Sequence, residues 1–104
     1  MYARIWRGWT RAAQADSYEE LLRSEVFPGI RARCPTGLER IDLLRRDEGE
    51  EVGFVTVMWF SDRAALEAFA GPDGEAAYVP AAARQILARF DDRAGHYLVR
   101  HSDE

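Results

Sequence analysis

The stretch from Glu51 to Phe60 constrains the fold of this chain most, because it predicts a β-strand that is apolar on both faces. At a repeat of two residues, one face carries Val52, Phe54, Thr56, Met58 and Phe60, and the other carries Gly53, Val55, Val57 and Trp59. Helices of the chain itself can cover one face of a small sheet. A second copy of the chain is the natural cover for the other face, so we expect a homodimer.

The length and charge of the chain limit its domain count and its partners. A chain of 104 residues can bury one modest core, so we expect a single domain over residues 1–104. The formal net charge of −4 repels a nucleic-acid backbone on average, and no basic stripe interleaved with aromatic residues reverses this locally. Nucleic acid is therefore not an expected partner.

Other features concern location and excluded chemistry. The residues after Met1 show no signal-peptide pattern, and no apolar run approaches the roughly 20 residues of a membrane span, so we expect a cytoplasmic protein that does not enter a membrane. The lone Cys34 cannot form an intrachain disulfide, which suits a reducing compartment. The chain contains no lysine, which excludes Schiff-base chemistry and a phosphate-loop lysine.

Hydrophobic alternation predicts three further strands, at Tyr2–Trp9, Leu38–Arg46 and His96–His101. The polar turn Asp47–Glu50 joins the second of these strands to Glu51–Phe60 as a hairpin. With intervening helices, the order is β-α-β-β-α-β. Right-handed crossovers then give an α+β, ferredoxin-like fold, in which a four-stranded antiparallel sheet has its first and third strands in the centre and helices on one face.

Capping and breaking residues mark the helices. Ser17 and Glu20 have the spacing of a capping box at the start of the first helix, and Pro28 is expected to end or kink that helix. Ser61 or Asp62 is expected to cap a second helix. An additional helix is expected over Pro80–Phe90, with proline in its first turn.

No familiar catalytic or metal-binding motif occurs in the chain. His96 and His101 lie five residues apart on one predicted strand and so face opposite sides, without a cysteine pair to help, and we expect no metal site. There is no glycine-rich phosphate loop and no Gly-x-Ser-x-Gly elbow.

The remaining candidates are aromatic side chains. Trp59 is expected to wall a pocket between sheet and helices, with Phe69 and Tyr78 contributed by the helical segment. The alternative is that these residues simply fill the core. Tyr78 adds a hydroxyl that needs a partner if buried, and His96 adds a group that titrates near neutral pH.

Two arginines occupy mid-strand positions where an unpaired charge is costly. Arg4 and Arg7 must therefore either reach the rim of the sheet or meet an acidic group or an anionic ligand.

Several segments resemble the antibiotic biosynthesis monooxygenase-like proteins, a group within the dimeric α+β barrel superfamily. The segments are Ala3-Arg4-Ile5-Trp6 with Gly8, Trp59-Phe60-x-Asp62, Ala68-Phe69-Ala70-Gly71-x-Asp73, Ala77-Tyr78-x-Pro80 and His96-Tyr97-x-Val99. The resemblance implies two ferredoxin-like sheets facing each other in a homodimer. It also implies a cofactor-independent monooxygenase that uses O₂ on a small aromatic or polyketide-like phenol or enol.

The resemblance suggests a role for each candidate residue. His96 is the expected base, Tyr78 a hydrogen-bonding partner, Trp59, Trp6 and Phe69 the pocket walls, and Arg7 or Arg4 the cation beside the developing anion.

The chain also departs from characterised relatives at defined positions. Val55 stands where the polyketide enzymes have asparagine, and Tyr78 stands where haem-degrading relatives have an axial histidine. Many members have histidine at the position of Phe69. Haem cleavage is therefore not expected. One alternative to an oxygenase is a non-catalytic dimeric module of the same fold that binds a small ligand or stabilises a partner, and another is an isomerase or lyase on that fold.

Overall fold

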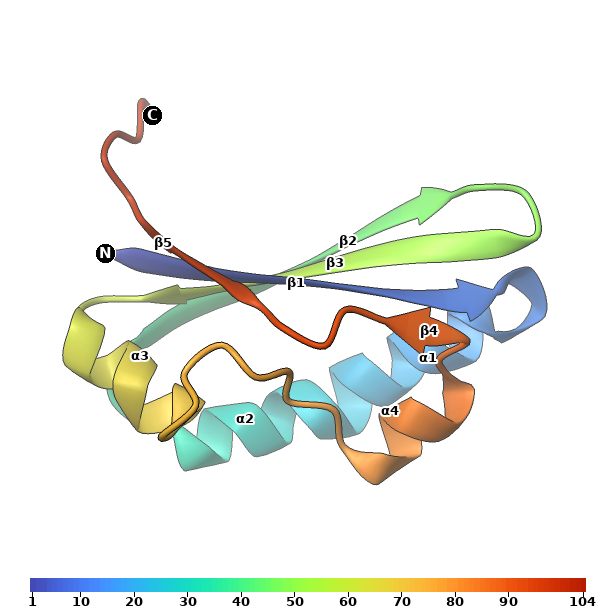
Figure 1. Ribbon diagram of the computed structural model, residues 1–104, viewed down its shortest axis with the longest axis horizontal. Helices are drawn as coiled ribbons and strands as arrows, with labels where there is room; N and C mark the ends of the chain where they lie inside the picture. Colours follow the sequence, from blue (N-terminus) through green and yellow to red (C-terminus); the bar gives the residue numbers. More distant parts are fainter.

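The computed structural model describes residues 1–104 as an antiparallel sheet with helices on one face (Figure 1). The strands are β1 (Tyr2–Arg11), β2 (Leu38–Asp47), β3 (Glu51–Phe60), β4 (Arg89–Phe90) and β5 (Gly95–Leu98). The helices are α1 (Ala15–Leu21), α2 (Phe27–Arg33), α3 (Arg63–Ala70) and α4 (Ala81–Ile86), with a 3₁₀ turn at Ala12–Gln14 and a π-turn at Leu22–Val26. This confirms the ferredoxin-like α+β class.

The sheet order is β2-β3-β1-β4, and β5 also pairs with β1, so the first and third strands are central as predicted. The sheet has five strands and not four, because the final edge strand is interrupted between β4 and β5. There the chain leaves β1 and bonds to an upstream loop: Ala77 N donates to Asp92 O at 2.8 Å, and Ala94 N donates to Glu75 O at 2.7 Å.

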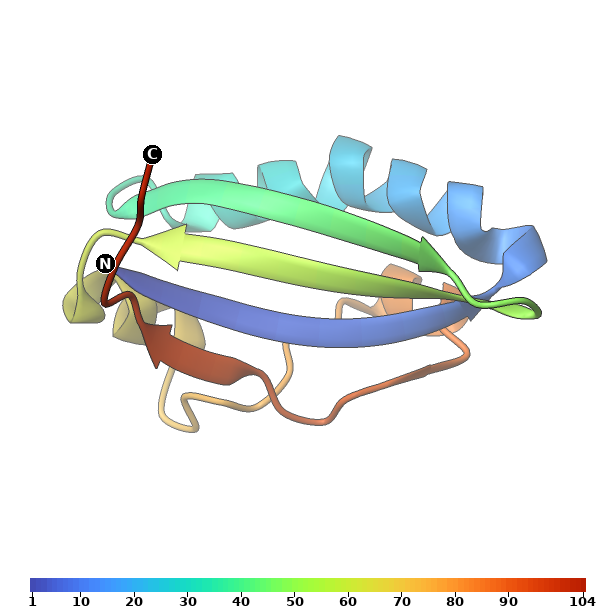
Figure 2. The ribbon, with the colours of Figure 1, turned by 90° about the horizontal axis from the view of Figure 1, so that it is seen from above.

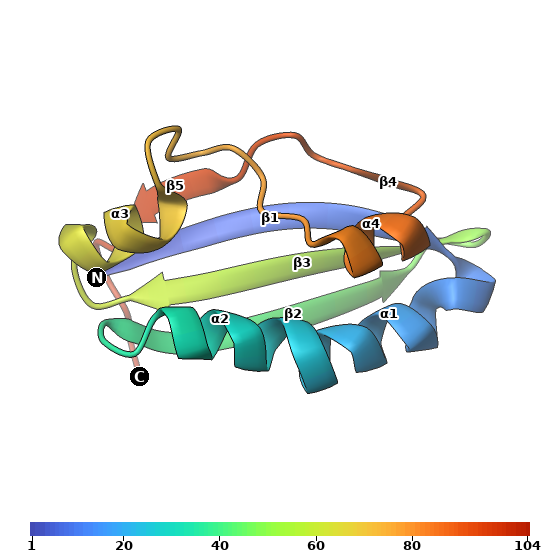
Figure 3. The ribbon, with the colours of Figure 1, turned by 90° about the horizontal axis from the view of Figure 1, so that it is seen from below.

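The first helical segment differs from expectation at its start and at Pro28. Ser17 lies inside α1, and the residue before α1, Gln14, makes no side-chain cap, so the capping box does not form. Pro28 does not end the helix, because the π-turn before it shifts the backbone register and places the proline in the first turn of α2, where no amide donor is needed. Figure 3 shows α1, the π-turn and α2 as one continuous rod.

The later elements are shorter than predicted. Asp62 caps α3 as expected, accepting a hydrogen bond from Ala65 N at 2.8 Å. The following helix stops at Ile86, because Leu87 turns extended and the chain then pairs with β1, which places Phe90 in β4. The last strand ends at Leu98, so His101 lies outside it. None of the helices is both long and apolar enough to cross a membrane.

Cross-strand pairing assigns each side chain to a face of the sheet. Arg4 pairs with Met58 and Trp6 with Thr56, so these residues share the face that the helices cover. The buried side chains there form two clusters. One contains Ala15, Tyr18, Leu22, Val52, Phe54 and Ala83, and the other contains Ile30, Leu38, Met58, Phe60, Leu66 and Phe69.

The opposite face, toward the viewer in Figure 2, has no helix over it. Its central apolar side chains include Ile5, Val55 and Val57. Leu44 of β2 is 54 % exposed and Tyr97 of β5 is 58 % exposed at its margins. Both faces of β3 therefore carry apolar side chains, and within one chain only one of these faces is covered by helices.

Candidate functional site

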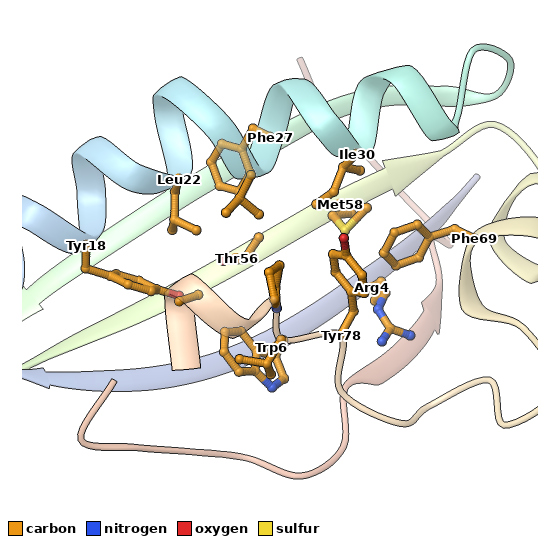
Figure 4. Close-up of a pocket in the computed structure, with 14 residues that line it drawn as sticks. Arg4, Trp6, Tyr18, Leu22, Phe27, Ile30, Thr56, Met58, Phe69 and Tyr78 are labelled. Carbon is orange, nitrogen blue, oxygen red and sulfur yellow. The ribbon is translucent and has the colours of Figure 1, made fainter. Parts of the chain in front are cut away.

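A small pocket lies between the two core clusters, under the helices (Figure 4). On β3, the short side chain of Thr56 stands between the larger Phe54 and Met58, so the core is not filled at this point. The free volume is about 50 Å³. Most of the lining is apolar, which keeps water from solvating a bound ligand.

Tyr18 of α1 and Tyr78 of the loop before α4 occupy opposite ends of the pocket (Figure 4). Tyr18 is only 1 % exposed, and burial raises the pKa of its hydroxyl, so the group stays protonated. Tyr78 is 41 % exposed and its ring meets Phe69 edge-on, with centroids 5.5 Å apart. One end of the pocket is thus enclosed and the other reaches the surface.

Arg4 brings a positive charge to the Tyr78 end, although only 3 % of its surface is exposed. Nη1 donates to Gly74 O and Nη2 to Ala76 O, both at 2.7 Å. Burial lowers the pKa of Arg4 and nearby Glu75 opposes the change, but a guanidinium keeps its charge in proteins. The loop carbonyls therefore hold the cation in place.

His96 of β5 lies beside Arg4 but does not line this pocket. Arg4 Nη1 is 2.6 Å from His96 Nε2, and since arginine can only donate, Nε2 must be the acceptor and the imidazole proton sits on Nδ1. Burial and the adjacent Arg4 charge lower the pKa of His96, with Glu75 acting in the opposite direction. The neutral imidazole is favoured, but its only lone pair is engaged.

Four of the predicted site residues line the pocket, namely Arg4, Trp6, Phe69 and Tyr78. Trp6 is fixed by its indole N–H, which donates to Asp91 O at 2.7 Å.

The structure places the other two candidates, Trp59 and Arg7, on the uncovered face. Trp59 pairs with Ala3 across β1, and its indole donates to Asp42 Oδ2 at 2.9 Å. Arg7 forms an ion pair with Asp91 at 3.1 Å. Trp59 does not wall a helix-side pocket as expected. Side chains alternate between the two faces along β3, and the odd-numbered positions point away from the helices.

Two hydroxyl-bearing residues of the pocket, Tyr18 and Thr56, were not among the predicted site residues. Each lies in a stripe that is otherwise apolar, Tyr18 with Leu22 on the first helix and Thr56 between apolar neighbours on β3. A hydroxyl on a core-facing stripe requires a partner, and that requirement is the signal that could have identified both residues.

No family model and no curated protein matches the chain, but solved structures do match its fold. A protein from Nitrosomonas europaea, provisionally named an antibiotic biosynthesis monooxygenase, is 14 % identical over 97 % of this chain and 100 % of its own, with a TM-score of 0.65. A similarly named Bacillus cereus protein is 12 % identical over 99 % of this chain and 96 % of its own, with a TM-score of 0.66.

A third structure is a mutant of SnoaB from Streptomyces nogalater, which is described as a cofactor-independent oxygenase. It is 19 % identical over 97 % of this chain and 95 % of its own, with a TM-score of 0.61. At these identities the likeness establishes the fold. It confirms the ferredoxin-like α+β fold of the single chain.

Proposed function

We propose that this chain is a cofactor-independent monooxygenase that uses O₂ on a small aromatic phenol or enol. The observation that carries the proposal is the apolar pocket with a buried, positively charged Arg4 at one end. A dry pocket strengthens the attraction between that charge and a developing oxyanion. The description of SnoaB as a cofactor-independent oxygenase supports extending this chemistry to a chain of the same fold.

The reaction needs no external reductant. The phenol or enol ionises beside Arg4, and the electron-rich anion transfers an electron to O₂. Recombination at a ring CH₂ and loss of water give a ketone, so that CH₂ and O₂ become C=O and H₂O. The substrate carbon supplies the four electrons that reduce O₂.

Among the pocket residues, Arg4 takes the role of the cation, Trp6 and Phe69 form walls, and Tyr78 is placed to hydrogen-bond the substrate at the open end. His96 acts as the base only after its bond to Arg4 opens, since Nε2 is otherwise occupied. If the bond between His96 and Arg4 stays closed, a substrate that is acidic enough to ionise beside Arg4 needs no base.

We also propose that the active form is a homodimer joined through the uncovered face of the sheet. Ile5, Val55 and Val57 give that face an apolar centre that a second copy would remove from water. Arg7 and Trp59 then lie at the subunit interface, away from the chemistry in this chain.

Oxygen uptake with hydroxynaphthalenes and anthrones tests the proposed chemistry. The wild-type chain should consume O₂ only with substrate, one O₂ per oxygenated product, without added metal or flavin. Trp6→Ala should reduce the rate by at least tenfold. Glu25→Gln, on the exposed side of the π-turn, should not alter it. Absence of uptake across the panel would contradict the oxygenase.

The alternative is a dimeric module that binds a small ligand without reacting with it. The specific observation in its favour is that no carboxylate and no unengaged imidazole lines the pocket. Ligand binding in the absence of any oxygen uptake would favour the module.

A further inference from the structure

We propose that the Tyr18 hydroxyl is the donor that binds an oxygen atom of the ligand at the enclosed end of the pocket, and so selects ring compounds that carry such an oxygen. The proposal rests on the proposed function only in taking the pocket as the ligand site.

The Tyr18 side chain is built into the core but its oxygen has no protein partner. Its ring meets Phe54 edge-on, with centroids 4.9 Å apart, and the residue is 1 % exposed. None of the protein's side-chain hydrogen bonds involves this hydroxyl, and the Tyr18 ring reaches from α1 into the lining of the pocket (Figure 4). Thr10 Oγ1 is a fully buried oxygen without a partner, but it lies outside the pocket.

Apart from the Thr56 hydroxyl, which lies midway along the pocket on β3, the other polar groups around the pocket are already engaged or can reach water. The Trp6 indole donates to Asp91 O, and Arg4 donates to two carbonyls and to His96. Tyr78 is 41 % exposed, so water can bond its hydroxyl. Tyr18 is therefore the donor at the enclosed end that only a ligand or a trapped water can satisfy.

The protonation state of Tyr18 fits this role. Burial raises the pKa of its hydroxyl, which keeps the proton available for donation throughout the neutral range. A ring that carries an acceptor oxygen restores the missing hydrogen bond, whereas the same ring without oxygen leaves the hydroxyl buried and unpaired.

The test compares 4-methylphenol with toluene, which lacks the oxygen, in anaerobic buffer. Binding is followed by NMR through the indole N–H of Trp6, the pocket tryptophan; Trp9 and Trp59 lie on the other face. We expect Tyr18→Phe to weaken binding of 4-methylphenol about five- to tenfold and to leave toluene binding unchanged or improved. Tyr97→Phe removes the same atom from an exposed site on the uncovered face and should change neither affinity.

The thermal midpoint of Tyr18→Phe separates a ligand-binding role from a structural one. Because the hydroxyl has no protein partner, the variant should unfold at the wild-type temperature or above it. Equal affinity of wild type and Tyr18→Phe for 4-methylphenol overturns the proposal, as does failure of 4-methylphenol to shift the Trp6 signal. Tyr18-dependent binding without oxygen uptake would reject the oxygenase while leaving this inference intact.

Discussion

Arg4 and His96 lie directly opposite each other on β1 and β5, and Arg4 Nη1 donates to His96 Nε2 over 2.6 Å. The same guanidinium bonds the carbonyls of Gly74 and Ala76, so one buried side chain ties the edge strand and the loop before α4 to the centre of the sheet. This contact positions the open end of the pocket, and it makes both stability and any base chemistry of His96 depend on pH.

Protonation of His96 should destabilise the fold. Burial and the Arg4 charge lower the pKa of His96 from its ordinary 6.5, so the folded state binds a proton more weakly than the unfolded chain. The contribution is fully present above the unfolded pKa, and it is lost as the pH falls through the folded pKa. Urea unfolding from pH 8 to pH 5 measures the effect. His96→Gln keeps an acceptor but cannot titrate, so its stability should depend less on pH; an unchanged slope would contradict the assignment.

Removing the Arg4 guanidinium should lower the free energy of unfolding more than replacing it with another cation. Arg4→Met leaves the Gly74 and Ala76 carbonyls and His96 Nε2 without a donor, and should lower the free energy of unfolding by about 1–3 kcal/mol. Arg4→Lys keeps the charge but cannot bridge three acceptors and should recover only part of this. Denaturant unfolding compares the two, and hydrogen exchange at Ala76 should rise in both. Full recovery by lysine would show that charge alone matters.

The uncovered face of the sheet should mediate dimerisation. Leu44→Asp places a charge on that face, where the wild-type side chain is 54 % exposed, and should shift the protein toward monomer. Leu98→Asp is a matched control, since Leu98 is 53 % exposed but belongs to the helix-side register. Light scattering after gel filtration gives the mass of each variant. A monomeric wild-type chain at micromolar concentration would contradict the proposal.

Two glycines with the same backbone conformation should differ in their tolerance of a side chain. Gly37 and Gly49 both have φ of +90°, so alanine should cost about 1–2 kcal/mol at either position. At Gly37 the new Cβ would also clash with Ala65 Cβ of α3, whereas Gly49 faces open space. Gly37→Ala should therefore be clearly the more destabilising in thermal or urea unfolding. Equal losses would mean that α3 moves away freely.

The parts of the fold that local sequence determines were predictable. The bounds of β3, the hairpin and the Asp62 cap follow from alternation, a polar turn and a helix-capping residue. The break between β4 and β5 was not predictable, because it depends on hydrogen bonds to Glu75 and Ala77, which no local pattern encodes.

The candidate site was only partly predictable for a related reason. Since β3 is apolar on both faces, its sequence does not specify which face the helices cover, and Trp59 was assigned to the wrong one. Arg4 and Trp6, in contrast, carry N–H donors on the face that the helices cover, and both line the pocket. Tyr18 shares a helical stripe with apolar residues, and its spacing alone does not distinguish a ligand-binding hydroxyl from a core side chain.

The helix-side pocket is proposed to convert a phenol or enol with O₂ alone. Mass spectrometry of the product formed under ¹⁸O₂ tests it most directly, using the wild-type chain after removal of metals and flavins and an anthrone as substrate. We expect one ¹⁸O atom per product ketone, and little product from Trp6→Ala. Product without ¹⁸O, or equal labelled product from Trp6→Ala, would contradict it.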